Sequence, residues 1–207
     1  MPYRFAEIAF TPMVRRVQDQ QGSREAYARL EAHPDERNRQ LGAAEADFIA
    51  ARDSFYMATV GETGWPYVQH RGGPAGFLRV LDETTIGFAD FRGNRQYVTV
   101  GNLATDDRVS LFLMDYRRRR RLKILGRATI VGPDDRAMLA RLEIPDYRAR
   151  VERGVLVSVE AFDWNCPQHI TERFTGDEVI ALSEPLRARI AELEAELARR
   201  QSPGPQR

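Results

Sequence analysis

The chain is poor in cysteine and histidine. Cys166 is the single cysteine among 207 residues, which excludes an internal disulfide and a zinc site built from cysteine alone. His33, His70 and His169 lie far apart and lack the His-x-x-x-His spacing of a zinc site, so we expect no bound metal. Such sparse cysteine fits a reducing compartment, and we expect a cytoplasmic protein.

The sequence also lacks long apolar runs and an excess of either charge. No run approaches the roughly eighteen residues of a membrane span. The first residues include Glu7 and no continuous apolar stretch, so a signal peptide is not expected either. The 31 basic residues offset 30 acidic ones, and the net charge of +1 argues against a general electrostatic hold on nucleic acid.

Apolar residues make up 43% of the chain, which is enough for a sizeable core. The length indicates one domain with appendages. We divide it into an N-terminal helical arm (residues 1–43), a barrel (residues 44–175) and a C-terminal helix with a tail (residues 176–207). Within the arm, Ser23 can cap a helix. Residues 1–10 form either an arm packed on the body or a mobile tail.

Strand patterns dominate the middle of the chain. FYMATV and WPYVQHR flank the turn GETG, and further alternating runs continue to VSVEAFDW. Six or seven antiparallel strands joined by hairpins predict a mainly β fold, a barrel with flanking α-helices, closed so that no strand edge is exposed. Helical segments are expected at residues 43–52, 95–104 and 134–150.

The C-terminal helix carries a regular apolar seam. Leu186, Ile190, Leu193 and Leu197 are spaced by four, three and four residues, and Glu and Arg flank them. The pattern is typical of a short coiled coil or of a helix packed along an edge. Little more than two heptads cannot hold a dimer alone, so the helix is expected to pack on something larger.

A cluster of basic and small residues follows one of the strands. Arg92 and Arg95 supply planar donor forks, and Gly93 lets backbone N–H groups approach an anion. The cluster indicates a phosphate site, although a solvated turn fits the same residues. On an upstream strand, alternation places Gln69 and Arg71 on one face, where Arg71 can reach the same anion.

Four segments in order, GWPYVQHRGG, IGFADFRGNRQ, DDRVSLFL and RRLKILGRATIV, resemble the pyridoxamine 5′-phosphate oxidase-like flavoproteins. The resemblance covers about residues 45–165. It implies an FMN-binding split β-barrel of six to seven antiparallel strands. It also implies an obligate homodimer whose FMN sites lie at the subunit interface.

The resemblance carries over to individual positions of this chain. Those along the flavin ring and ribityl chain are Gln69, His70, Arg71 and Gly72. Those near the phosphate end are Ala89, Asp90, Asn94, Arg95 and Gln96. Because the family usually has a lysine at the position of Gln96, Arg92 or Arg71 must supply the missing positive charge.

A second basic run, Arg117–Arg121 with Lys123 behind it, has two interpretations. Arg117–Arg119 fit a solvated hairpin tip, and no interleaved aromatic residues provide stacking platforms for nucleic acid. Alternation can turn Arg121 and Lys123 toward a ligand cleft, where a cation near the flavin carbonyl edge stabilises the reduced ring. The resemblance implies that Arg121 reaches the flavin of the other subunit.

The turn after the last strand offers aromatic and polar side chains. The resemblance implies that one aromatic position here approaches the partner subunit's flavin, a place that either Trp164 or Asn165 fills. Gln168 and His169 are candidates for ring or substrate contacts, and His169 fits a surface or capping role equally well. Cys166 fits a small packed thiol, because no base is identifiable beside it.

These features predict an FMN-dependent oxidoreductase. It would transfer electrons between a reduced donor, such as a nicotinamide, and a small molecule, and no residue is assigned as a general acid or base because the flavin carries the redox chemistry. Pyridoxamine phosphate oxidation itself is disfavoured, since NCPQHI replaces the Arg- and His-rich substrate contacts of that activity. The alternative is a non-catalytic flavin- or haem-binding protein on the same fold, with His70 or His169 as the axial ligand.

Overall fold

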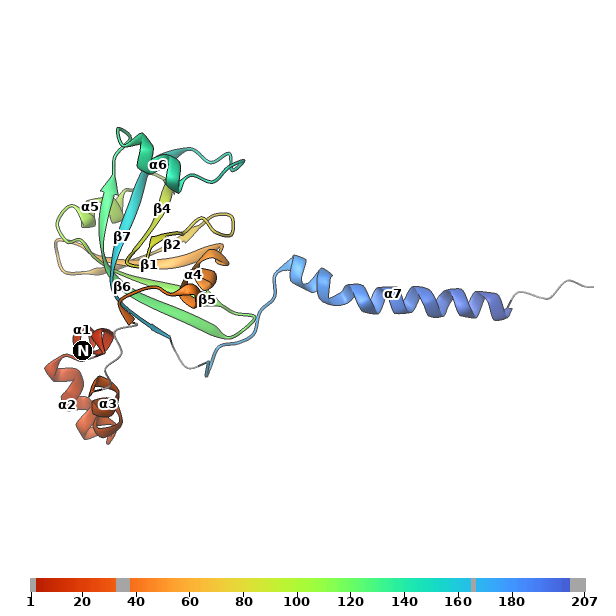
Figure 1. Ribbon diagram of the computed structural model, residues 1–207, viewed down its shortest axis with the longest axis horizontal. Helices are drawn as coiled ribbons and strands as arrows, with labels where there is room; N and C mark the ends of the chain where they lie inside the picture. Colours follow the sequence, from red (N-terminus) through yellow and green to blue (C-terminus); the bar gives the residue numbers. More distant parts are fainter. Residues whose placement is uncertain (1–2, 33–37, 165–166, 202–207) are drawn as a thin grey trace, which may run out of the picture.

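The fold is known from a computed structural model that describes residues 3–32, 38–164 and 167–201 (Figure 1). Seven strands form one antiparallel sheet in the order β2-β1-β5-β6-β7-β4-β3. The strands are β1 (Ser54–Val60), β2 (Pro66–Gly72), β3 (Arg79–Asp82), β4 (Thr85–Phe91), β5 (Arg108–Asp115), β6 (Arg120–Val131) and β7 (Val151–Trp164).

The sheet is strongly curled but does not close. Its edge strands are β2 and β3, and no ladder joins these two edges within the described residues. Curling still brings β2 opposite β4, because a guanidinium nitrogen of Arg71 lies 2.6 Å from a carboxylate oxygen of Asp90. The expected split barrel of six to seven antiparallel strands is therefore confirmed, whereas the expectation that closure removes every strand edge is wrong.

Alternation along the strands builds the core. On β1 and β5, Phe55, Met57 and Leu111 are at most 1% exposed, and β6 adds Leu122 and Ile124, both fully buried. Each of these side chains lies two positions from the next along its strand, as one face of a pleated sheet requires. The core occupies the concave side of the curled sheet, and its apolar face supplies the main driving force for folding.

Glycine allows the longest strand pair to bend. The register between β6 and β7 shifts between Leu125 and Gly126. A Cβ atom at position 126 would lie 2.5 Å from the carbonyl oxygen of Ser158, so a larger residue would push the two strands apart. The bend lets β6 and β7 turn around the core and aim β4 at β2.

Short helices precede the strands or connect them. They are α1 (Arg4–Ala9), α2 (Pro12–Gln20), α3 (Arg24–Ala32), α4 (Ala43–Ala50), α5 (Val98–Leu103) and α6 (Arg136–Leu142). In α1, Phe5 and Ala6 are buried where this helix meets β7. The first ten residues, where described, thus pack on the body. The expected helix at 134–150 is shorter, because Asp135 caps its start and Glu143 is already extended.

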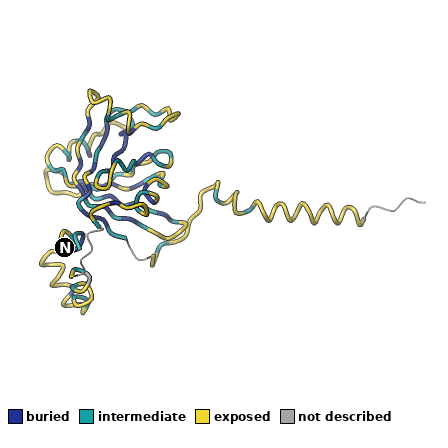
Figure 2. The backbone as a smooth tube through the Cα atoms, in the orientation of Figure 1, coloured by how far each residue is buried: buried dark blue, intermediate teal, exposed yellow. Residues whose placement is uncertain are grey.

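The last helix, α7 (Gly176–Gln201), extends away from the barrel (Figure 1). Exposed residues run along nearly all of its length (Figure 2). No helix of the described chain is long and apolar enough to cross a membrane. The division of the chain into arm, barrel and C-terminal helix stays a prediction.

Candidate functional site

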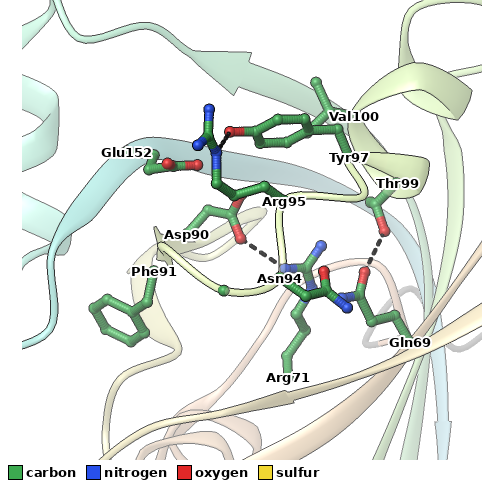
Figure 3. A pocket seen from close by; sticks show the side chains of 11 residues that line it. Gln69, Arg71, Asp90, Phe91, Asn94, Arg95, Tyr97, Thr99, Val100 and Glu152 are labelled. Carbon is green, nitrogen blue, oxygen red and sulfur yellow. Dashed lines mark hydrogen bonds and ion pairs between the residues drawn. The ribbon is translucent and has the colours of Figure 1, made fainter.

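A cavity opens where β2, β4 and the loop before α5 meet (Figure 3). Its volume is about 240 Å³, and a neighbouring cavity of about 170 Å³ shares four of its lining residues. The first cavity is lined by Gln69, Arg71, Asp90, Phe91, Gly93, Asn94, Arg95, Tyr97, Thr99, Val100 and Glu152. The second adds His70, Gly72, Phe77, Phe88 and Ala89.

A buried ion-pair network forms the floor of the cavity. Asp90 is 8% exposed and lies 2.6 Å from Arg71 across the opening of the barrel. Its second carboxylate oxygen lies 3.4 Å from Nε of Arg153, the residue opposite it on β7. A buried carboxylate is tolerated only when it is paired, and two arginines pair this one.

A buried donor of a residue that lines the cavity has no hydrogen-bond partner in the described part of the chain. Nε of Arg71 is buried and has no hydrogen-bond partner among the described residues. An unsatisfied buried donor carries a desolvation cost, so a group that accepts a hydrogen bond from it would be stabilised there. The cavity therefore favours an acceptor, such as an oxyanion, beside Arg71.

The loop that follows β4 is held in an unusual conformation. Arg95 and Tyr97 both have left-handed backbones, with φ of 63° and 55°. The Arg95 guanidinium donates a hydrogen bond from Nε to the Tyr97 hydroxyl at 3.1 Å, and this bond raises the pKa of Arg95. Arg153 lies over the Tyr97 ring at 5.0 Å. Left-handed non-glycine residues cost about 1 kcal/mol or more each and occur preferentially at binding sites.

A hydrogen bond fixes the side of the cavity next to β2. The Thr99 hydroxyl donates to Oε1 of Gln69 at 2.8 Å, and Thr99 is buried (Figure 3). This bond joins the first turn of α5 to β2, as Asn102 of the same helix does through Thr59 of β1 at 2.9 Å. These two hydrogen bonds fix α5 against β1 and β2, and they thereby position the loop that leads from β4 into α5.

Positive charge is in excess around the cavity. Four arginines, Arg71, Arg92, Arg95 and Arg153, are set against the two carboxylates Asp90 and Glu152. This leaves two positive charges, which matches a phosphate monoester of about −1.5 to −2 charge at neutral pH. The arrangement is suited to binding a phosphorylated ligand.

The structure brings many of the sequence-predicted site residues together. Those lining the two cavities are Gln69, His70, Arg71, Gly72, Ala89, Asp90, Asn94 and Arg95. The alternation along β2 is as expected: Gln69 and Arg71 are half-buried, and His70 is exposed with its ring against Tyr56.

Two residues of the same loop lie beside the cavity without lining it. Arg92 has Nε 3.7 Å from Glu152. Gln96 is exposed, and its backbone N–H donates to the Asn94 side chain at 3.2 Å. Arg153, which pairs with both Asp90 and Glu152, adds a cation that the sequence did not predict for this site.

The other predicted residues lie elsewhere in the chain. Arg121 lies over the Phe112 ring at 5.9 Å, and Lys123 lies 2.7 Å from Asp163. Their neighbours Leu122 and Ile124 point into the core, so both cations are on the outer face of the sheet and do not line the cavity.

The turn after β7 is likewise remote from the cavity. Trp164 donates from Nε1 to Glu45 at 2.7 Å and packs edge-on against Phe48 of α4. Asn165 lies outside the described residues, and Gln168 is exposed in the turn that follows. Neither Trp164 nor Gln168 lines the cavity of its own chain.

Sequence reasoning missed several lining residues. Tyr97, Thr99 and Val100 follow the arginine cluster directly, so their position in the sequence could have identified them as candidates for the cavity lining. Glu152 and Arg153 lie about sixty residues further on, and only the pairing of β4 with β7 brings them to the site. No pattern in the sequence reveals that register.

Comparison with known proteins places the chain in a family. A family model described as pyridoxamine 5′-phosphate oxidase matches residues 41–163. A conserved hypothetical protein from Mycobacterium tuberculosis is similar in structure, at 18% identity over 70% of this chain and 98% of the other, with a TM-score of 0.48. HupZ from Group A Streptococcus shares 16% identity over 65% of this chain and 100% of the HupZ chain, with a TM-score of 0.47.

A third solved structure is a putative pyridoxamine 5′-phosphate oxidase from Lactobacillus delbrueckii. It shares 19% identity over 60% of this chain and 94% of the other, with a TM-score of 0.46. No curated protein matches the chain. The family model alone spans more than half of the sequence, and the chain belongs to the pyridoxamine 5′-phosphate oxidase family.

Proposed function

We propose that the chain binds FMN in the joined cavities and acts as an oxidoreductase. Members of its family commonly bind flavin. The observation that carries the proposal is the excess of two positive charges around a cavity with an unsatisfied buried donor at Arg71. A phosphate is the FMN group that would satisfy both features.

Each part of the cavity has a role in this proposal. Arg95 and Asn94, on the exposed loop, bind the phosphate, and Arg71 and Arg153 add positive charge beneath it. Gln69, whose oxygen accepts from Thr99, lies on the wall beside the ring. Bound FMN would supply the redox chemistry, while the chain binds the cofactor and orients it.

The second subunit completes the proposed site. Family members are typically dimeric. Arg121, Lys123 and Trp164 lie on surfaces of the chain that do not meet its own cavity, so they would act on the flavin of a partner. A cation from the partner near the ring would favour its reduced, anionic form.

The experiment that tests the proposal is a titration with FMN and with riboflavin. Flavin fluorescence reports binding of both, and the two ligands differ only in the phosphate. We expect FMN to bind at least about tenfold tighter, because a charge-assisted hydrogen bond contributes roughly 1.5–3 kcal/mol. Equal affinities would place the phosphate outside the cationic cavity, and no binding of either ligand would overturn the proposal.

Electron transfer needs a separate measurement. Addition of a reduced nicotinamide to the FMN complex should bleach the flavin absorption under anaerobic conditions if the protein accepts electrons from that donor. A complex that stays oxidised with nicotinamides but is reduced by dithionite would favour a flavin-binding protein without this activity. A sharp Soret band in the purified protein would favour haem instead.

A further inference from the structure

Helix α7 leaves an apolar seam uncovered. The helix extends away from the barrel (Figure 1), and nearly all of its residues are exposed (Figure 2). Four apolar side chains, Leu186, Ile190, Leu193 and Leu197, keep 46–68% of their surface in water. A regular apolar stripe of this kind on an isolated helix is suited to a helical partner.

The charges beside the seam are divided between its two halves. Arg187 and Arg189 flank the first half, and Glu194 and Glu196 flank the second. If the seam residues occupy heptad positions a and d, Arg187 and Glu194 are both at e, and Arg189 and Glu196 are both at g. The helix is therefore complementary in charge to a copy of itself that runs in the opposite direction.

We propose that α7 pairs with α7 of a second copy in antiparallel orientation. In this register Leu186 packs on Leu197 of the partner subunit, and Ile190 packs on Leu193 of the partner subunit. Two-fold symmetry repeats both of these side-chain contacts, so the same surface is buried on each copy. Every seam residue then meets an apolar partner.

Charge decides between the two orientations. In the antiparallel pair, Arg187 faces Glu194 of the partner subunit and Arg189 faces Glu196 of the partner subunit. In a parallel pair Arg189 would still meet Glu194, but Arg187 would face Leu182 and Glu196 would find no arginine. Within the chain Arg189 pairs with Glu192 at 2.8 Å, an exposed contact that is weak enough to exchange.

The seam is too short to hold two copies together by itself. From Leu186 to Leu197 it measures roughly 17 Å, at about 1.5 Å per residue. Interfaces of stable complexes bury roughly 1,200–2,000 Å², more than a seam of this length offers. The helix pair therefore adds to an association that other surfaces of the chain also make.

Sedimentation equilibrium of the full chain tests the pairing. Leu193→Glu places a charge in the seam, and the matched control Ala195→Glu places the same charge on the opposite side of the helix. We expect Leu193→Glu to weaken self-association at least about tenfold and the control to leave it unchanged. Circular dichroism verifies that both variants keep the helix. Equal association of both variants and the parent chain, or a monomeric parent, would overturn the proposal.

Cross-linking tests the orientation in chains that carry Cys166→Ser. Leu186→Cys and Leu197→Cys variants are oxidised separately and then as a mixture. A disulfide needs Cα atoms within about 7 Å. The antiparallel pair therefore gives a mixed dimer of the two variants and no dimer of Leu186→Cys with itself. A disulfide between two Leu186→Cys chains, or no disulfide in the mixture, would contradict the antiparallel register.

Discussion

Arginine has two different roles at the candidate site. Arg71 and Arg153 are largely buried, and Asp90 pairs with both, so they set the background charge of the cavity. Arg95 is exposed and pairs with no carboxylate among the described residues; its Nε donates to Tyr97 instead. Because guanidinium groups present five donors, Arg95 keeps several donors for an anion.

Arg95→Ala tests whether the exposed Arg95 side chain binds the phosphate. We expect it to lower FMN affinity by about 1.5–3 kcal/mol, the contribution of a charge-assisted hydrogen bond, and to leave riboflavin affinity unchanged. Arg29→Ala, which removes an exposed arginine of α3, is the control for net charge. Fluorescence titration measures both ligands. An unchanged FMN affinity would show that Arg95 does not bind the phosphate.

Residue types at this site were largely readable from the sequence. Arg92, Gly93 and Arg95 stood out by composition and by their place after a strand. Gly93 does line the cavity, yet a Cβ there would meet no atom within 4 Å, so the chain itself does not require glycine. The balance of charge was not readable, because it depends on Arg153, which only the sheet register brings to Asp90.

At the scale of elements, one carboxylate joins three segments. Asp115 ends β5 and is 4% exposed. It lies 3.1 Å from Arg52, which follows α4, and it accepts from the backbone N–H of Arg118 in the turn before β6 at 2.9 Å. Burial alone would raise the pKa of Asp115, but the Arg118 hydrogen bonds and the Arg52 charge outweigh it, and the pKa is lowered.

Asp115→Asn should therefore destabilise the protein in a pH-dependent way. A lowered folded-state pKa gives stability that is present above the unfolded value of about 3.9 and is lost as pH falls through the folded value. We expect a loss on the order of 3 kcal/mol near neutral pH, since the Arg52 charge loses its carboxylate partner, and a smaller loss at pH 2, which lies below the unfolded value.

Urea unfolding at both pH values measures the Asp115 effect. Asp107→Asn, in the exposed pair with Arg127, serves as the control and should cost less than about 1 kcal/mol. A difference between Asp115→Asn and the parent chain that does not change with pH would assign the loss to packing rather than to ionisation.

Trp164 ties α4 to the end of β7. Trp164→Phe should cost about 1–2 kcal/mol of unfolding free energy, because it keeps a ring against Phe48 but removes the hydrogen bond to Glu45. Thermal unfolding measures the loss. A Trp164→Phe/Glu45→Gln double variant should lose little more than the single variant, and additive losses would mean that the two side chains act independently.

Strands were more predictable than helices in this chain. The strands follow a period of two that is visible in the residues, and their turns carry glycine or aspartate. In contrast, α1 and α2 are short, and only Thr11 with Pro12 marks the start of the second. Such helices are stabilised mainly by packing, as when Phe5 of α1 is buried where that helix meets β7. Sequence patterns indicate such tertiary contacts poorly.

At the scale of the whole molecule, the open sheet explains the position of the site. The expectation of full closure came from the cost of exposed edges. Instead β2 and β4 face each other through side chains, with Arg71 and Asp90 in contact across the opening. The cavity lies at this opening, so it exists because the sheet does not close.

The central claim is that this opening binds FMN, and one absorption spectrum tests it most directly. The purified chain is incubated with excess FMN and separated from free ligand by gel filtration. We expect the two-band flavin spectrum to elute with the protein at about one FMN per chain, because the proposal assigns one FMN to the cavity between β2 and β4 of each chain. A protein peak without flavin absorption would contradict the claim.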